Sequence, residues 1–329
     1  MKKLLKRLCM LSGIFIIIGA VVFGIGFLGS DLEFKNLSHL TTKAYAYTES
    51  VQAAGTEINK VTIAYESNAN VRVQFSDTAD IISASYGSMV TKNGKSAGTV
   101  TLTDANGHLQ IKETRSWKEK FRTLAWSSAF AEVNVEVTLP ADRTYELAIY
   151  TNTGDVSFDG TACNFSSLTI IGDTTDIYLQ NTEISCSGDV KIETDTGDAK
   201  LGNLTAKNVR IETDTGDVKL QGDLLAETLQ MECDTGDCEI FGKLSTKNVR
   251  IETDTGDVVM KNNSILDAEI ILIETDTGDV HVNLAGTLLD YTITVDVDTG
   301  KCNVSNLNAG ARKLNISVDT GDVYVYFAN

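Results

Sequence analysis

Apolar and polar residues alternate on both sides of a short turn that recurs through the second half of the chain. The clearest copy, residues 211–218, reads Ile-Glu-Thr-Asp-Thr-Gly-Asp-Val. Nine copies can be aligned, at 149–156, 170–177, 192–199, 211–218, 231–238, 251–258, 273–280, 295–302 and 316–323. Alternation that switches phase at a Thr-Gly corner predicts a strand, a turn and a second strand in every copy.

The apolar positions also form columns when the copies are aligned on the turn glycine. Five residues before it stand Ile149, Ile170, Ile192, Ile211, Met231, Ile251, Ile273, Val295 and Ile316. The copies repeat every 19 to 22 residues, a period typical of solenoids, in which each coil buries its apolar face against its neighbours. No helix fits inside so short a coil. The sequence therefore predicts an all-β fold, a parallel β-solenoid (β-helix) of about nine coils, about 4.8 Å apart, in a rod on the order of 43 Å long.

The N-terminal residues predict a membrane anchor. A basic tail, residues 1–7, precedes a run without charges from Leu8 to Leu28, which is 21 residues long. Such a run can cross a hydrocarbon core, and the basic residues stay inside. A cleaved signal peptide is the competing interpretation, but its apolar part is usually shorter, about 7–15 residues. We expect a single transmembrane helix at 8–29 in the cell membrane, a cytoplasmic N-terminus, a juxtamembrane spacer at 30–56 and an extracellular C-terminal region.

Residues 57–145 predict a β-rich cap in front of the solenoid proper, which we place at 146–329. Short alternating runs lie at 61–63, 71–75, 99–102, 109–111 and 133–137. Turns are expected at Asn68, Asn70, Asn93-Gly94 and Asn106-Gly107. A β domain here would cover the open end of the stack, which solenoids require.

This combination of features resembles a known family. A Val-x-Val-x-Leu-Pro step at 135–140 is followed by repeated Thr-Gly-Asp-Val coils, behind an N-terminal anchor. The chain is in these respects similar to the bacterial putative-adhesin β-repeat domain family, a domain of unknown function, over roughly residues 57–327. The resemblance implies a bacterial cell-surface protein, with relatives often associated with envelope-stress and signalling operons. It implies no catalytic residues.

The net charge of −17 and the pI of about 4.6 disfavour nucleic acid as a partner. Most of this charge lies in the repeats, because residues 189–322 hold 26 acidic and 12 basic side chains, a net of −14. The acidity of the chain is therefore a property of the coils.

Two aspartate columns flank the turn glycine and are the sharpest candidate for chemistry. In the five regular copies they comprise Asp195, Asp198, Asp214, Asp217, Asp234, Asp237, Asp254, Asp257, Asp276 and Asp279. Stacked in register, their like charges would recur about every 4.8 Å. The oxygens could cap the turn by accepting backbone N–H groups, or they could form a ladder of ligands for Ca²⁺, which takes six to eight oxygens. Lys301, at one such position, favours capping, because an ammonium cannot ligate a metal.

No enzyme motif accompanies the carboxylates. A glycosidase site is one singular pair of carboxylates with separated pKa values, whereas here each carboxylate is a copy of its neighbours. His39, His108 and His281 are scattered. We therefore expect no enzyme activity and no cofactor other than the calcium alternative.

The positions of the cysteines in the repeat indicate mainly small buried side chains. Cys233 replaces an inward threonine, and Cys238 and Cys302 replace inward valines. Cys163 and Cys186 fall at similar depth in adjacent coils, so a bridge between them is geometrically conceivable.

An aromatic and basic stretch at 115–130 leaves two alternatives open. Trp117, Phe121 and Trp126 stand among lysines and arginines there. A helix of this kind can contact an anionic membrane surface or a partner, or it can cap the open end of the solenoid, which we favour.

Taken together, these features predict a membrane-anchored bacterial surface solenoid with a non-catalytic binding or structural role, an adhesin by resemblance, whose partners would be the membrane and a surface ligand. The alternative is an envelope-stress accessory protein that modulates a membrane signalling partner. An enzyme that acts on polysaccharides is the remote third.

Overall fold

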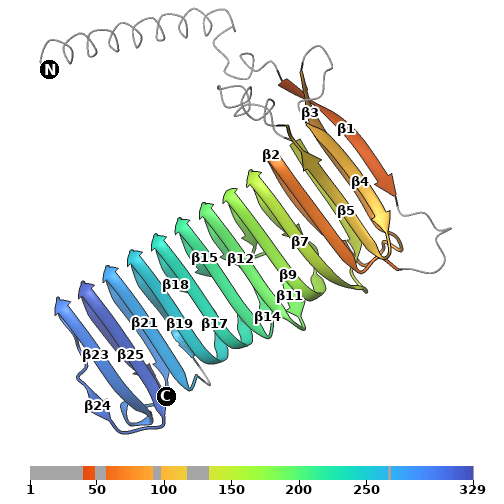
Figure 1. Cartoon of the computed structure of the whole chain (residues 1–329). Coiled ribbons are helices and arrows are strands. Elements are labelled where there is room, and N and C mark those ends of the chain that lie inside the picture. The colour runs from red at the N-terminus through yellow and green to blue at the C-terminus, as the bar shows by residue number, and fades with distance from the viewer. Residues whose placement is uncertain (1–39, 49–56, 92–97, 117–132, 266–267, 329) are drawn as a thin grey trace, which may run out of the picture.

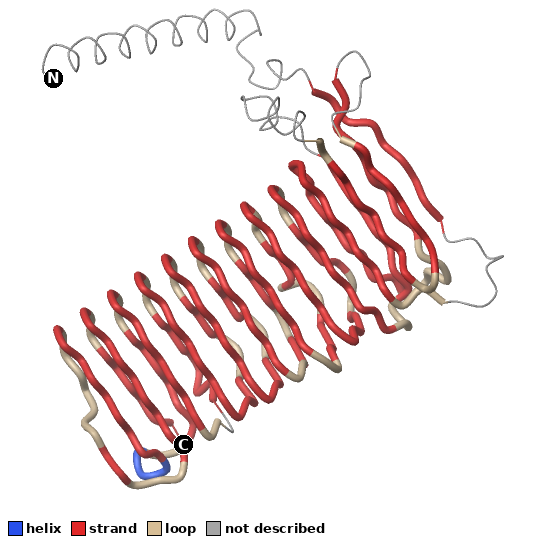
Figure 2. Tube along the Cα trace, in the orientation of Figure 1, coloured by secondary structure: helices blue, strands red, loops and turns tan. Residues whose placement is uncertain are grey.

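The computed structural model describes residues 40–48, 57–91, 98–116, 133–265 and 268–328, and these form one long stack of parallel coils with a smaller antiparallel portion at its N-terminal end (Figure 1). Apart from one short 3-10 helix, Leu288–Asp290, all the regular elements there are strands (Figure 2). The predicted all-β solenoid is confirmed. No helix in the described ranges is long and apolar enough to cross a membrane, and the predicted segment 8–29 lies outside those ranges.

One regular coil shows how the sequence folds. Strand β15 (Asn208–Thr215) ends at Gly216, the chain turns there, and β16 (Val218–Leu220) continues at an angle to it. Gly216 has a φ of 147°, and a Cβ on it would lie 2.1 Å from the carbonyl oxygen of Gly197 in the previous coil. The turn therefore requires glycine both for its backbone angle and for the close approach of the previous coil.

Successive coils stack in register on three faces. Face one holds the long strands before each glycine: β7 (Thr144–Thr153), β9 (Ala162–Thr174), β12 (Asp189–Thr196), β15, β17 (Leu224–Thr235), β19 (Leu244–Thr255) and β21 (Ile270–Thr277). Face two holds the strands after it: β8 (Val156–Asp159), β10 (Ile177–Leu179), β13 (Ala199–Leu201), β16, β18 (Cys238–Ile240), β20 (Val258–Ile265) and β22 (Val280–Ala285). Face three is made by β11 (Glu183–Cys186), β14 (Leu204–Thr205) and the first residues of β9, β17 and β19.

The core is the set of columns that the alternation predicts. Ile211 pairs with Ile192 on one side and with Met231 on the other, and all three are fully buried. Burying such a side chain stabilises the fold by about 1.5–3 kcal/mol, so the stack gains stability at every coil. The intervening residue Arg210 faces solvent, as expected.

The N-terminal cap differs from the expectation in one respect. The runs at 61–63 and 71–75 belong to a single 17-residue strand, β2 (Lys60–Ser76), with no turn at Asn68 or Asn70. The strand stays continuous because it is paired on both sides: with β7 and β8, and with β5 (His108–Thr114) and β6 (Val133–Pro140). It thus adds one more layer beneath the first coil.

Antiparallel strands complete the cap. β4 (Thr99–Ala105) pairs with β5 through a turn in which Asn106 and Gly107 have positive φ, as predicted. β3 (Ser83–Thr91) joins β6 to β1 (Leu40–Thr48). β1 lies within residues 30–56, which we expected to form only a spacer. That expectation was wrong for β1, because its pairing with β3 makes it a strand of the sheet.

At the other end, the order of coils in space differs from their order in the chain. The last coil, β25 (Arg312–Thr320) with β26 (Val323–Ala328), lies between β21–β22 and β23 (Tyr291–Thr299). β23 is therefore the outermost long strand, partly covered by β24 (Leu307–Asn308) (Figure 1). The columns of β21, β23 and β25 carry equivalent apolar residues, so the repeat pattern does not select which of them are neighbours.

Candidate functional site

The aspartates that follow each glycine form a continuous hydrogen-bonded ladder between coils. The Oδ1 atom of Asp198 accepts the backbone N–H of Asp217 at 3.0 Å, and Asp217 in turn accepts that of Asp237 at 3.0 Å. The same bond joins Asp176 to Asp198, Asp237 to Asp257, Asp257 to Asp279, Asp279 to Asp322, and Asp322 to Lys301, each at 2.8 Å. Each carboxylate thus satisfies a backbone donor of the next coil.

The second oxygen of several of these carboxylates is also engaged. Oδ2 of Asp198 lies 2.9 Å from the ammonium of Lys200, and Oδ2 of Asp217 lies 3.0 Å from that of Lys219. Burial alone would raise the pKa of Asp198, but the N–H of Asp217 and the charge of Lys200 outweigh it, and the pKa lies below its ordinary value. Asp198 is therefore an ionised carboxylate that caps the turn of the next coil.

The aspartates that precede each glycine are placed differently. Asp195, Asp214, Asp234, Asp254 and Asp276 are all exposed, and within the described residues their side chains have no hydrogen bond or ion pair. Partial burial and the charges of Asp214 and Asp254 raise the pKa of Asp234. This column is a row of like charges at the outer edge of the corner.

Neither column forms a metal centre in the structure. In the part of the chain that the structure describes, no group of three or more His, Cys, Asp or Glu side chains could hold a metal ion. Binding of Ca²⁺ to the ladder stays a prediction. Each ladder carboxylate already accepts a backbone N–H, and those of Asp198 and Asp217 also pair with lysines, where a Ca²⁺ ion would need free oxygens.

The outer surface of face one carries ion pairs along and between coils. Arg210 donates to Glu212 at 2.7 Å and to Glu232 of the next coil at 3.2 Å, and Arg250 donates to Glu252 at 2.6 Å. Exposed pairs of this kind contribute about 0–1 kcal/mol each. They offset the acidity of the coils and leave little unpaired charge on this face.

A groove of about 770 Å³ crosses several coils at the junction of face three and face one. Its floor is a column of small side chains, Ala206, Ala226 and Thr246, which are almost fully buried. A neighbouring column carries leucine or isoleucine, whereas the side chains of this column are small. The surface is hollowed here as a result. Leu225 lies at the rim with 53% of its surface exposed.

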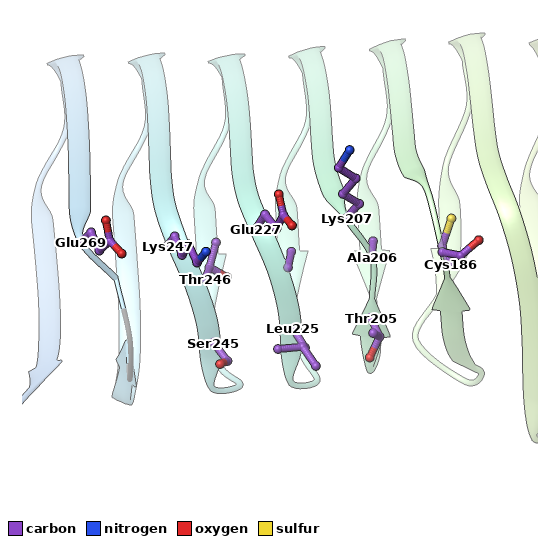
Figure 3. A pocket seen from close by; sticks show the side chains of 12 residues that line it. Cys186, Thr205, Ala206, Lys207, Leu225, Glu227, Ser245, Thr246, Lys247 and Glu269 are labelled. Carbon is purple, nitrogen blue, oxygen red and sulfur yellow. The ribbon is translucent and has the colours of Figure 1, made fainter.

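A row of alternating charges lies along this groove. Lys207, Glu227, Lys247 and Glu269 occupy equivalent positions in four successive coils, and all are exposed (Figure 3). Backbone bonds hold them in line: Glu227 N–H donates to Lys207 O at 2.8 Å, and Glu269 N–H to Lys247 O at 2.7 Å. Lys313 of the inserted last coil lies next to the end of this row without belonging to it, because its N–H donates to Glu269 O at 2.8 Å while the residue itself is in register with Ile270. Within the described ranges, no ion pair joins one member of the row to another.

The repeat pattern of the sequence did not predict this groove. Its residues lie outside the Thr-Gly-Asp motif, where the copies differ most, although aligning the position nine residues before each glycine would have shown the alternation of charge. Trp117, Phe121 and Trp126, the predicted membrane or partner contacts, lie outside the described residues.

The cysteines are placed only partly as predicted. Cys233 and Cys238 are buried, as expected, but Cys302 is exposed. That prediction was wrong because the outermost coil departs from face two after Gly300, where a single bridge to Val323 remains. Cys163 and Cys186 are free and buried, and Cys186 pairs in register with Phe165 rather than with Cys163.

A repeat β-solenoid with a hydrogen-bonded aspartate corner is the class of protein that this geometry defines. More specifically, the chain belongs to the Toastrack DUF4097 family, whose sequence profile matches residues 58–325. The comparison with curated proteins found no significant match.

Solved structures with a similar arrangement share little sequence with the chain. One is described as a putative adhesin from Parabacteroides merdae ATCC 43184 (12% identity, 88% of this chain and 97% of that one, TM-score 0.46). Another is a putative adhesin from Bacteroides fragilis NCTC 9343 (13% identity, 86% and 97%, TM-score 0.36). A third is described as a putative lipid binding protein from Parabacteroides distasonis ATCC 8503 (11% identity, 87% and 97%, TM-score 0.38). At these values the likeness carries no argument about ligands.

Proposed function

We propose that the protein is a non-catalytic binding protein of the bacterial cell surface, anchored by residues 8–29, whose groove on face three holds an extended polymer that bears both amino and carboxyl groups. The observation that carries the proposal is the row of alternating charges from Lys207 to Glu269 beside an apolar floor (Figure 3). The row offers the same charge at every second coil, which suits a linear, repeating ligand better than a small molecule.

The spacing of the charges in the row limits the class of ligand that can match it. Coils recur about every 4.8 Å, so charges of one sign recur about every 9.6 Å. That distance is close to one disaccharide of an extended β-linked glycan. A surface glycan with one amino and one carboxyl group per disaccharide would match both the distance and the signs, and complementary charges contribute to specificity more than to affinity.

Binding to cell-wall glycan tests the groove. Full-length protein in detergent should cosediment with insoluble glycan that carries free amino and carboxyl groups, and blocking the amines by N-acetylation should weaken the binding. Lys247→Glu should raise the dissociation constant about tenfold, equivalent to about 1.4 kcal/mol. Lys112→Glu, the same charge change at an exposed position of β5, is the matched control. If both variants bound the glycan equally well, the groove would be excluded as the glycan-binding site.

Topology is tested separately. Protease added to intact cells should remove the 189–329 region if the anchor at 8–29 leaves it outside. Protection of that region in intact cells, with cleavage after lysis, would overturn the surface location and leave the groove to be judged by binding alone.

A further inference from the structure

Two cysteines meet at one corner of the solenoid and at no other corner that the structure describes. Cys233 stands three residues before Gly236 and Cys238 two residues after it. Both side chains are fully buried, and their sulfur atoms lie 2.8 Å apart. In the flanking copies the same two positions are Thr213 with Val218, and Thr253 with Val258.

The backbone holds the two sulfurs in this position. Gly236 turns the chain with a φ of 148°, so that β17 and β18 converge on the inside of the corner. The N–H of Gly236 donates to Thr255 O at 2.9 Å, and that of Cys238 to Asp257 O at 3.0 Å. The separation of the sulfurs exceeds the length of a disulfide bond, about 2.05 Å, by less than about 1 Å. Both thiols are free in the structure, so the bond requires the two sulfurs to move closer together.

Packing alone gives no reason for sulfur at this corner. The flanking copies fill the same space with threonine and an aliphatic residue, and there the threonine hydroxyl gains a bond. Thr213 Oγ1 donates to Gly197 O and Thr253 Oγ1 to Gly236 O, both at 3.2 Å. No such bond is formed by Cys233 within the described residues. The two replacements also fall in the same coil, at the two positions whose side chains touch.

We propose that Cys233 and Cys238 form an intrachain disulfide that covalently closes this corner. The oxidant is another disulfide, R–S–S–R, of a protein or of a small thiol. One cysteine thiolate attacks it, forms a mixed disulfide and releases R–S⁻, and the second cysteine thiolate then attacks the first sulfur and releases the second R–S⁻. Two S–H protons leave, the two cysteine sulfurs lose two electrons, and R–S–S–R is reduced to two thiols.

The timing of the exchange follows from burial. The contact with Cys233 and burial raise the pKa of the Cys238 thiol well above its ordinary value, and a thiol in this state is a poor nucleophile. Exchange therefore takes place before the coil closes over the pair, during folding. Once formed, the disulfide is shielded from external reductants for as long as the coil stays folded.

Counting free thiols tests the proposal on the wild-type chain. Full-length protein refolded in a mixture of oxidised and reduced glutathione is unfolded in an alkylating reagent, without reductant, and analysed by mass spectrometry. Four of its six cysteines should be alkylated, and a peptide containing 233 linked to 238 should be recovered. Alkylation of all six, or recovery of a bridge between Cys163 and Cys186 instead, would overturn it.

Two variants supply the control. Cys238→Val, which restores the residue of the flanking coils, should leave Cys233 alkylatable and five thiols in total. Cys233→Thr combined with Cys238→Val should fold like the wild type, but its melting temperature should not respond to reductant present during refolding, whereas that of the wild type should fall. Because the thiol count does not involve the groove or the anchor, its outcome is independent of the proposed function.

Discussion

The two aspartate columns that flank each turn glycine share residue type and spacing, yet they lie in different surroundings. Asp217, after its glycine, lies between coils and accepts the N–H of Asp237. Asp214, before the glycine, projects into solvent from the outer edge of the corner. The pKa shifts differ accordingly, downwards for Asp198 and upwards for Asp234. Asp198 thus stabilises the stack when it is ionised, whereas Asp234 is tolerated in spite of its charge. A repeated residue therefore has to be interpreted from the atoms around it.

The largest effect is expected when an aspartate is moved to the inside of the coil. Ile211 is fully buried between Ile192 and Met231, so Ile211→Asp should lower the free energy of unfolding by about 4 kcal/mol or more. Arg210→Asp, one residue away and outward, should cost about 1 kcal/mol through the loss of its exposed ion pairs. Urea denaturation of both variants measures the difference, and similar midpoints would mean that the inward and outward sides are misassigned.

Next in size is the glycine that separates the two columns. A Cβ at Gly236 would lie 2.1 Å from the carbonyl oxygen of Gly216, at a φ of 148°. Gly236→Ala should therefore force the coils apart and cost about 3 kcal/mol. Thr235→Ala, at the exposed position beside it, is the control and should change the midpoint little. If Gly236→Ala left the free energy of unfolding unchanged, the corner would not depend on the close contact between Gly236 and the carbonyl oxygen of Gly216.

A moderate effect is expected for the aspartate that caps the turn. Asp217→Ala removes the acceptor of the Asp237 N–H, and the unpaired donor should cost about 1–2 kcal/mol. Asp217→Asn should be nearly neutral, since an amide oxygen can accept the same bond. Asn70 already does so for the N–H of Asp155, at 3.0 Å. If Asp217→Asn lowers the melting temperature as much as Asp217→Ala does, the charge of Asp217 rather than its hydrogen bond stabilises the corner.

A smaller effect should appear as the pH is lowered. The raised pKa of Asp234 means that the folded state binds this proton before the unfolded state does, so stability should rise slightly as the pH falls from neutral towards the ordinary value of 3.8. Below 3.8, the lowered pKa of Asp198 means that the unfolded state takes up the proton first, and stability should then fall. Denaturant titrations at constant ionic strength should show this maximum, and Asp234→Asn should flatten its upper side. A steady decline from neutral pH would contradict the contrast between the columns.

Calcium should produce the smallest effect. A ligand at 100 times its dissociation constant adds about 2.7 kcal/mol per site, whereas screening of the exposed column should shift the melting temperature only slightly, and magnesium should reproduce the shift. If calorimetry detected stoichiometric calcium binding that Asp217→Asn abolished, the aspartates would be calcium ligands.

The sequence was sufficient to predict the coils, because an apolar column such as that of Ile211 has only one way to be buried in a stack. It was not sufficient where the result depends on neighbours that the motif does not encode. The double pairing of β2 made a continuous strand of the predicted turn at Asn68. The departure of the outermost coil exposed Cys302. The groove depends on the small size of Ala206 and Ala226, a property of one variable column rather than of the repeat.

The inserted last coil also fixes an order of events during synthesis. β23 pairs in parallel with β25, yet β25 is translated after it. The ribosome therefore delivers the outermost layer, β23, before β25, the layer that belongs beneath it. Domains generally form from the N-terminus as the chain emerges, but this end of the rod cannot close until β25 and β26 have also emerged.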